Sequence, residues 1–329
     1  MLLASTSHTN PKLPVPIPHP AITTSISSII SQSKLKIMAT ADAVKSAWQN
    51  STDVAQRYKM AENATRPFAK TMVDLTEQLT TIKTTPVQIF DLGCGTGAVV
   101  AEIYASLKQE QWGDVEVLAG DVSPAMLEYL KKRGEEEGWS GLTTKMVDGT
   151  KLESADLANS FSHIFVGFAV FMLPPDTISQ LAKKLASGGT LAVSTWAYLP
   201  WFSLLERTLE KVDGGPSMPT EKQLWAMMTN GLAWEDKAFV RKQLEEAGLN
   251  KVEVVQRKEN VDCGTPETFM TTFKFVLGML STQWPEEKRG KWVEEIADAM
   301  TAILTEDVGG PDKHVFMEFE GIVGVGLKG

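Results

Sequence analysis

The amino-acid sequence predicts an α/β fold: a doubly wound, mostly parallel sheet of seven strands with an N-terminal helical cap and helical insertions. Between residues 87 and 196, short apolar runs alternate with segments of helical periodicity, and this alternation indicates βαβ units in a parallel sheet. From residue 237 onward a further helix and strand resume the pattern. The hydrophobic content of 43% over 329 residues is sufficient for one large domain with a buried core.

The first predicted segment, residues 1–40, differs in composition from the rest of the chain. No acidic residue precedes Asp42, and the segment is rich in Pro, Ser and Thr, which is typical of an organelle-targeting leader or of a disordered tail. The lack of arginine before Arg57 and the interrupting prolines disfavour a leader, and a true start at Met38 is a third interpretation. We expect a disordered tail and a cytoplasmic protein.

The remaining segments are predicted from hydrophobic periodicity. Residues 41–85 predict an N-terminal helical cap of two or three helices, closed by Pro86. Residues 86–329 form the predicted main domain, with helical insertions at about 198–235 and 265–306. The last strand follows only a short turn-like stretch, so it need not arrive by a parallel crossover. The predicted strands cover residues 87–93, 115–121, 143–149, 163–170, 188–196, 251–259 and 313–329, and the helices between them residues 95–109, 123–138, 175–186 and 237–249.

The most specific local motif is a glycine-rich turn, DLGCGTG, that begins at Asp91 between a predicted strand and a predicted helix. Gly93, Gly95 and Gly97 let the backbone turn tightly and approach a ligand closely, where a Cβ would collide. In open α/β sheets such a ligand lies at the carboxyl ends of the strands. The GxGxG spacing and the preceding acid disfavour a dinucleotide, whose pyrophosphate requires GxGxxG, and no GKS or GKT follows as in a P-loop.

Acidic residues end the first three predicted strands of the sheet. Asp91 suits a cationic amino-acid group, Asp121 can accept hydrogen bonds from two ribose hydroxyls, and Asp148 can reach an adenine amino group. One nucleoside accounts for all three acids, whereas a nicotinamide dinucleotide leaves Asp148 without a function. The alternative for each is a turn or helix-cap role, although Ser123 and Pro124 can begin the next helix without Asp121.

At this point the motifs resemble those of a known family. DLGCGTG, GDVSPAML and VDGTKL, in this order, are similar to the class I S-adenosylmethionine-dependent methyltransferases, in particular the ubiquinone/menaquinone-biosynthesis-like branch. The resemblance is strong between Val87 and Trp196 and weaker elsewhere. RYKMAE, EEGW and GGTLAVSTWAYLPW resemble a fungal group of secondary-metabolism methyltransferases that includes the gliotoxin bis-thiomethyltransferase. The resemblance implies a Rossmann-like fold and methyl transfer from S-adenosyl-L-methionine to a small molecule.

The resemblance also implies roles for individual residues. Tyr58, from the helical cap, would close over the cofactor, Val122 and Met126 would lie against the adenine, and Asp148 and Gly149 would meet its edge. The glycine loop would line the methionine portion. The implied cofactor-binding residues are Tyr58, Asp91, Gly93, Cys94, Gly95, Gly97, Asp121, Val122, Met126, Asp148, Gly149 and Phe168.

The sequence offers no obvious general base, so we predict no catalytic side chain and no metal. His163 begins the fourth predicted strand, at the end opposite the expected site, and His314 lies just before the last strand. The Asn/Asp-Pro-Pro-Tyr motif of amino-methylating enzymes is not found after the fourth strand, where Gly167 and Phe168 stand instead. Catalysis by proximity, in which the nucleophile is aligned with the sulfonium methyl, is therefore the prediction.

Aromatic residues follow the carboxyl ends of the fourth and fifth strands and recur in the first insertion. Phe171, Trp196, Trp201 and Trp234 are the predicted substrate-binding residues, and their alternative is a place in the core. Together they predict a small acceptor that is apolar, aromatic or thiol-bearing, with sulfur, oxygen or nitrogen as its reacting atom.

Charge and hydropathy restrict the partners. The formal net charge of -9 repels phosphate backbones and disfavours nucleic acid, and no apolar run is long enough to span a membrane. A second hypothesis is a regulatory methyltransferase-like protein that binds the cofactor but acts through protein partners. The oligomeric state is left open.

Overall fold

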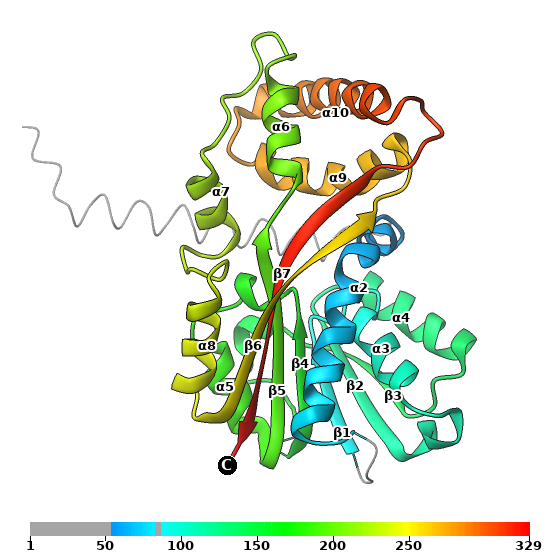
Figure 1. Ribbon diagram of the computed structural model, residues 1–329, viewed down its shortest axis with the longest axis vertical. Coiled ribbons are helices and arrows are strands. Elements are labelled where there is room, and N and C mark those ends of the chain that lie inside the picture. The colour runs from blue at the N-terminus through cyan, green and yellow to red at the C-terminus, as the bar shows by residue number, and fades with distance from the viewer. Residues whose placement is uncertain (1–53, 83–86, 159) are drawn as a thin grey trace, which may run out of the picture. The chain divides into compact units, whose positions relative to one another are not determined.

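The computed structural model describes residues 54–82, 87–158 and 160–329 (Figure 1), so the predicted tail at residues 1–40 lies outside the described residues. The strands are β1 (Val87–Leu92), β2 (Val115–Asp121), β3 (Leu142–Met146), β4 (Phe161–Gly167), β5 (Leu185–Tyr198), β6 (Leu249–Asp262) and β7 (Phe316–Lys328). The α-helices are α2 (Val54–Leu79), α3 (Ala98–Ser106), α4 (Pro124–Glu137), α5 (Thr177–Lys184), α6 (Trp201–Leu209), α7 (Glu221–Met228), α8 (Lys237–Glu246), α9 (Pro266–Ser281) and α10 (Glu286–Val308). Short 3-10 helices are η1 (Gln109–Asp114), η2 (Gly149–Lys151) and η3 (Val170–Met172).

The seven strands form one sheet in the order β3-β2-β1-β4-β5-β7-β6, which confirms the predicted doubly wound α/β fold. Neighbouring strands from β3 to β5 are parallel, whereas β7 runs antiparallel to both β5 and β6. The strand β7 is antiparallel because the chain enters it directly from the turn after α10. The N–H of Val315 donates to the carbonyl of Gly264, which fixes the start of that strand beside the end of β6.

Two strand boundaries differ from the prediction where the chain turns into the site. The third strand ends at Met146 instead of residue 149, and the fourth ends at Gly167 instead of residue 170. In both places the predicted apolar run continues, but its last residues leave the sheet. Phe168 takes a left-handed backbone with φ of 51°, far from the extended values that are usual in a strand, so the chain turns there toward η3.

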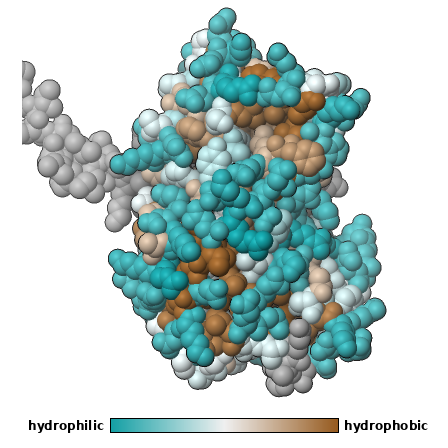
Figure 2. All heavy atoms as spheres, in the orientation of Figure 1, coloured by the Kyte–Doolittle hydropathy of each residue, from teal (hydrophilic) through white to brown (hydrophobic). Residues whose placement is uncertain are grey.

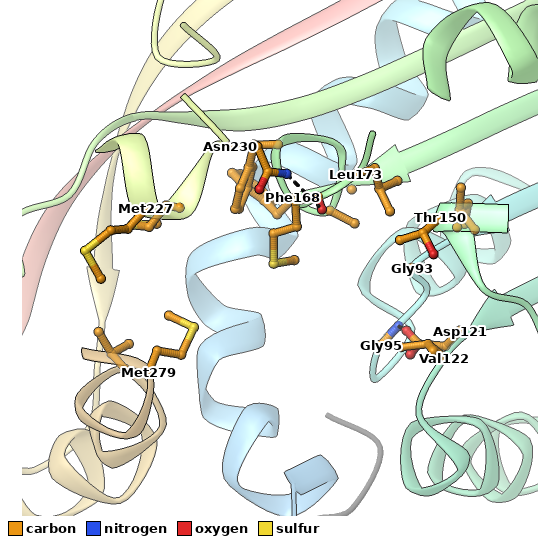
Figure 3. A pocket seen from close by; sticks show the side chains of 18 of the residues that line it. Gly93, Gly95, Asp121, Val122, Thr150, Phe168, Leu173, Met227, Asn230 and Met279 are labelled. Carbon is orange, nitrogen blue, oxygen red and sulfur yellow. Dashed lines mark hydrogen bonds between the residues drawn. The ribbon is translucent and has the colours of Figure 1, made fainter. Parts of the chain in front are cut away.

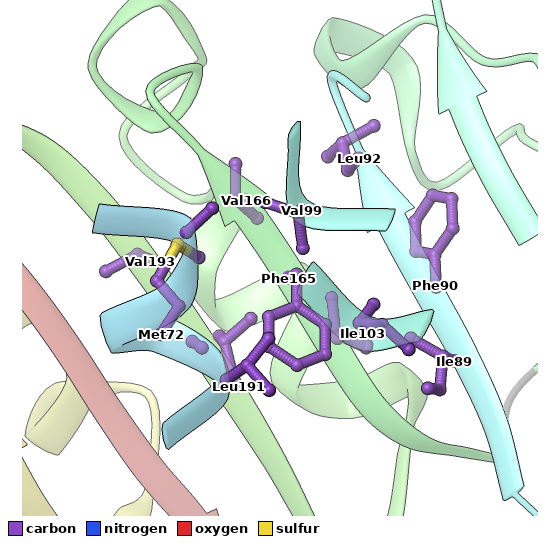
Figure 4. Packing of buried hydrophobic residues seen from close by; sticks show 14 of the residues in the cluster. Met72, Ile89, Phe90, Leu92, Val99, Ile103, Phe165, Val166, Leu191 and Val193 are labelled. Atoms are coloured by element: carbon purple, nitrogen blue, oxygen red, sulfur yellow. The ribbon is translucent and has the colours of Figure 1, made fainter. Parts of the chain in front are cut away.

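Helices α2 and α3 cover one face of the central strands (Figure 4). Met72 of α2 and Ile103 of α3 join Phe165 of β4 and Leu191 of β5 in one hydrophobic cluster, and all four are fully buried. Burial of each such side chain contributes roughly 1.5–3 kcal/mol. Within the described part of the predicted cap, α2 is a single helix that continues through Pro67. Its packing against the sheet offsets the hydrogen bond that proline cannot make.

A second hydrophobic cluster lies beyond the carboxyl end of β5, where α6, α9 and α10 meet the extended ends of β6 and β7 (Figure 1). These helices, with α7, come from the two stretches that the sequence predicts as insertions. Trp201 of α6 packs against Phe273 of α9 with ring centroids 5.3 Å apart. The helices therefore form a wall beside the ends of the parallel strands.

The face in Figure 2 is mostly hydrophilic, with hydrophobic areas over the upper helices and beside the lower sheet. Met146, Tyr198 and Phe316 are large hydrophobic residues that are exposed. Within the described part of the chain, no helix has the length and apolar run needed to cross a bilayer.

Candidate active site

The glycine loop leaves β1 at Leu92 and enters α3 at Ala98. Gly93, Gly95 and Gly97 have φ values of 72°, 51° and 91°, a region that favours glycine. A Cβ on Gly93 would lie 2.6 Å from the Cβ of Ala169, so the loop also needs glycine to approach the turn after β4.

Asp121 fastens this loop to the end of β2. Its Oδ2 accepts a hydrogen bond from the Gly95 N–H at 2.9 Å, and its Oδ1 accepts one from the Ser123 N–H at 2.9 Å. Burial raises the pKa of Asp121, and these backbone donors lower it. A carboxylate has about four acceptor positions, so the side chain keeps capacity for ligand hydroxyls. Ser123 caps α4 with its hydroxyl, which accepts from the Met126 N–H at 3.4 Å.

Asp91 is fully buried, and among the described residues neither of its carboxyl oxygens has a hydrogen-bond partner. Burial, followed by the nearby charge of Asp121, raises the pKa of Asp91 to about 8. Leaving such a group unpaired costs free energy, and a donor from outside the described residues, such as a ligand, would remove that cost. The carboxyl faces a small cavity that it shares with Gly93, Cys94 and Gly95.

Asp148 follows β3, and its Oδ1 accepts from the N–H and the hydroxyl of Thr150 at 3.0 and 2.7 Å. This is the predicted alternative, a cap, in this case of η2. Asp148 nevertheless also lines the main cavity, so the two roles coexist. Gly149 lies beside Leu173, and a Cβ there would approach the Leu173 Cδ2 to 2.7 Å.

The main cavity has a volume of about 320 Å³ and extends from the strand ends to helices α7 and α9 (Figure 3). Gly95 and Asp121 lie at one end, and Met227 and Met279 lie at the other. Nine predicted site residues line it, namely Gly93, Gly95, Asp121, Val122, Asp148, Gly149, Phe168, Phe171 and Trp201. The smaller cavity is lined by the predicted residues Asp91, Gly93, Cys94, Gly95 and Phe168.

Phe168 lines both cavities, as do Gly93, Gly95 and Gly167. Its ring stacks on Trp196 with centroids 3.9 Å apart and meets the edge of Phe68 at 5.4 Å. Its N–H donates to the carbonyl and the hydroxyl of Ser194, both at 3.1 Å. A left-handed phenylalanine is strained, and strain of this kind clusters at functional sites.

Two predicted cofactor residues are placed differently, and the side chain of a third lies outside the described residues. Gly97 lines neither cavity, because its role is steric: a Cβ there would collide with the Leu130 side chain. Met126 is fully buried and packs with Ala55 of α2 instead of facing the cavity. Tyr58 belongs to α2, but its side chain lies outside the described residues.

Two predicted substrate residues also do not line the cavity. Trp196 lies behind Phe168, so it supports the wall and does not form it. Trp234 is 2% exposed in the main core, where its ring meets the edge of Phe239. Trp234 therefore takes the alternative that the sequence also offered, a place in the hydrophobic core.

Trp234→Ala is therefore expected to destabilise the protein without changing ligand affinity. Removing a buried tryptophan leaves a cavity and costs about 3–5 kcal/mol. Chemical denaturation measures this loss, and calorimetry should show an unchanged Kd for S-adenosylhomocysteine in the folded variant. A clear loss of affinity in the fully folded Trp234→Ala variant would contradict this placement and show that Trp234 contributes to ligand binding.

Several lining residues were missed by sequence reasoning. They come from η3, from α7 and its following turn, and from α9. Asn230 is the polar one, with a left-handed φ of 53° and its Nδ2 donating to the Met172 carbonyl at 3.4 Å. Helical periodicity marks the apolar ones as buried but does not distinguish a cavity wall from core. The missed residues are Met172, Leu173, Leu224, Asn230, Val276, Met279 and Leu280.

Neither histidine singled out by the sequence lies at the cavity. His163 is buried within β4, and burial lowers its pKa to about 4. His314 pairs with Asp262 at 2.8 Å near the far ends of β6 and β7. Burial raises the pKa of the Cys94 thiol well above its ordinary value, so it is not a ready nucleophile. The geometry defines a class: an α/β group-transfer enzyme with a nucleoside site at the carboxyl ends of its strands.

Comparison with known proteins identifies a methyltransferase domain in this chain. Residues 89–189 match the family model of a methyltransferase domain. The acetylaranotin bis-thiomethyltransferase of Aspergillus terreus is 29% identical over 265 residues, which cover 80% of this chain and 90% of that protein. The methyltransferase ktnA of Aspergillus niger is 27% identical over 282 residues, 80% of this chain and 91% of that protein. The matched domain and these relatives identify the activity as methyl transfer that depends on S-adenosylmethionine.

Solved structures are more distant in sequence. The plantazolicin methyltransferase BamL, in complex with a triazolic desmethylPZN analog and SAH, aligns at a TM-score of 0.46 and 14% identity. That alignment covers 92% of this chain and 99% of the other.

Proposed function

We propose that this enzyme methylates a small, apolar and uncharged molecule, held in the helical half of the main cavity, and that the acceptor atom is a thiol sulfur. The observation that carries the proposal is the division of the site. Among the described residues that line the main cavity, carboxyl groups occur only at the ends of the strands. The part of the cavity that α7 and α9 line consists of methionine, leucine and valine side chains. An apolar chamber of this kind disfavours acceptors that carry a permanent charge.

The residues present fit S-adenosylmethionine, which supplies a methyl group activated by a positively charged sulfur. Asp91, buried and without a partner among the described residues, would accept the ammonium group beside the glycine loop. Asp121 would accept ribose hydroxyls, and Val122 and Asp148 would flank the adenine. Phe168 lines both cavities, so it would lie near the place where the amino-acid and nucleoside parts of one ligand join.

The chain's own residues would act by positioning and by excluding water. Among the described residues, the titratable side chains that line the main cavity are Asp121 and Asp148, both at its nucleoside end, so neither lies beside the acceptor as a base. The acceptor would therefore release its proton to solvent, and the resulting anion would attack the methyl group as S-adenosylhomocysteine leaves. Thiols release a proton near neutral pH more readily than phenols or alcohols do. The Aspergillus terreus relative is named a bis-thiomethyltransferase, and this supports a thiol as the acceptor here.

A screen of apolar thiols, phenols and amines tests this proposal directly. Each is incubated with S-adenosylmethionine and the enzyme, and mass spectrometry detects the gain of one methyl group. Methylation of thiols is the expected result. Methylation of amines alone would overturn the acceptor proposal, and an inert enzyme that still binds S-adenosylhomocysteine would favour the regulatory alternative.

Met279→Trp is expected to fill the acceptor end of the cavity and leave the nucleoside end intact. Methyl transfer should fall about 100-fold, because even small displacements of the reacting atoms have effects of that size. The Kd for S-adenosylhomocysteine should stay within about threefold of the original. Met146→Trp, at a residue that is 60% exposed on β3, is the matched control and should change neither quantity. If Met279→Trp lowers methyl transfer and affinity for S-adenosylhomocysteine by the same factor, the division of the site is contradicted.

A further inference from the structure

A buried ion pair joins α2 to α4 beside the glycine loop, and the proposed function does not yet use it. Glu62 Oε1 and Oε2 lie 3.1 and 3.0 Å from Arg133 Nη1. The side chains of Glu62 and Arg133 are only 5% and 10% exposed. The guanidinium carbon of Arg133 also lies 5.2 Å from the ring centroid of Trp139. Removing two charges from water is costly, so a buried ion pair needs further hydrogen bonds to offset the cost of desolvation.

Thr96, within the glycine loop, adds two hydrogen bonds to the pair, while the buried Nε of Arg133 has no hydrogen-bond partner among the described residues. The Nη1 of Arg133 donates to the Thr96 carbonyl at 2.9 Å, and the Thr96 hydroxyl donates to Glu62 Oε2 at 2.9 Å. On the other side of the loop, the N–H of the adjacent Gly95 is bound by Asp121. The loop is thus held from both sides, by the sheet through Asp121 and by two helices through the ion pair.

The loop requires such fastening because glycine has more conformational freedom to lose than any other residue. A loop that is loose before binding must be ordered by its ligand, and that cost lowers affinity. Helix α2 also contributes Thr65 to the wall of the smaller cavity, within one turn of Glu62. The same helix therefore fixes both the loop and the wall that faces it.

We propose that Glu62 and Arg133 are positioning residues for cofactor binding, which act through Thr96 to hold the glycine loop in its binding form. This inference rests on the proposed function, since it concerns the affinity of the same site for S-adenosylmethionine and S-adenosylhomocysteine. Neither residue lines either cavity, whereas Thr96 lines the smaller one. Any effect of Glu62 and Arg133 on affinity must therefore pass through the glycine loop or through the wall that α2 forms at Thr65.

Thr96→Val tests the proposal with both charges still paired. The variant loses the hydroxyl bond to Glu62 but keeps the volume of the side chain, and the Kd for S-adenosylhomocysteine should rise about five- to twentyfold. Thr96→Ser keeps the hydroxyl and should restore affinity to within about twofold. Thr208→Val is the matched control, because Thr208 is fully buried and donates to the Leu204 carbonyl at 2.7 Å on the distant helix α6.

Calorimetry of all three variants, below their melting transitions, separates the outcomes. Thr208→Val should lose stability and keep its Kd, whereas Thr96→Val should lose affinity. The double variant Glu62→Gln with Arg133→Met, which removes both buried charges, should lose affinity at least as strongly. Equal Kd values for Thr96→Val, Thr208→Val and the original protein would overturn the positioning role. An unchanged Kd in the double variant would overturn it too, because Thr96 lines the smaller cavity and would then act on the ligand directly. If the original protein itself does not bind S-adenosylhomocysteine, the proposed function fails instead.

Discussion

Asp91→Asn is expected to weaken S-adenosylhomocysteine binding roughly 100-fold or more, the usual scale when one member of a buried charge pair is truncated. The carboxyl is fully buried and lacks a partner among the described residues, so a ligand ammonium would supply its only strong interaction. An asparagine keeps the shape but cannot carry the charge. Calorimetry measures the Kd, and Asp262→Asn, at an exposed acid near the far end of β6, is the control.

The same substitution should change stability in the opposite direction. The pKa of Asp91 in the folded chain is about 8, above its ordinary value of 3.8, so the native state keeps a proton that the unfolded state releases. Its contribution to stability is therefore complete below about pH 4 and is lost as the pH rises to 8. The free Asp91→Asn variant should lack this loss. Denaturation at high pH should find it more stable than the original protein, and a less stable variant would contradict the burial argument.

Asp121→Ala is expected to produce the second large effect, because the side chain has two functions. It would bind ligand hydroxyls, and it accepts from the N–H groups of Gly95 and Ser123. Loss of the acceptor leaves two backbone donors unpaired, at about 1–3 kcal/mol each. The Kd for S-adenosylhomocysteine should rise about 100-fold, and the melting temperature should fall.

Asp148→Ala is the matched comparison, since Asp148 follows the next strand, β3, and also caps η2. Its carboxylate is tied to Thr150 and does not hold the glycine loop. We expect a loss of affinity near tenfold, about what one hydrogen bond provides. If the two variants lose affinity equally, Asp121 has no special role in shaping the loop.

The sheet and the nucleoside end of the site follow from local patterns. Apolar runs that end in Asp91 and Asp121 identify the strands, and parallel strands necessarily bring their carboxyl ends together. The glycine loop is recognisable because glycine tolerates the positive φ values that the loop adopts more readily than any other residue does. These features depend on short stretches of chain, which is why they are predicted from sequence.

The acceptor end depends on tertiary packing that periodicity does not reveal. Met279 and Trp234 both belong to apolar segments of the expected insertions, yet one lines the cavity and the other fills the core. Phe168 reads as part of a strand, but its turn depends on Ser194 and Trp196 from β5. The pair of Glu62 and Arg133 is separated by 71 positions, and nothing in either segment alone predicts it.

Proton release on ligand binding tests the central claim most directly. At neutral pH the carboxyl of Asp91 is protonated in the free protein, and it must ionise to pair with an ammonium group. Titration of S-adenosylhomocysteine in two buffers of different ionisation enthalpy should show close to one proton released at pH 7, with affinity that increases as the pH rises toward 8. Asp91→Asn should abolish both. Tight binding with no proton release, and with an affinity independent of pH in this range, would contradict the account.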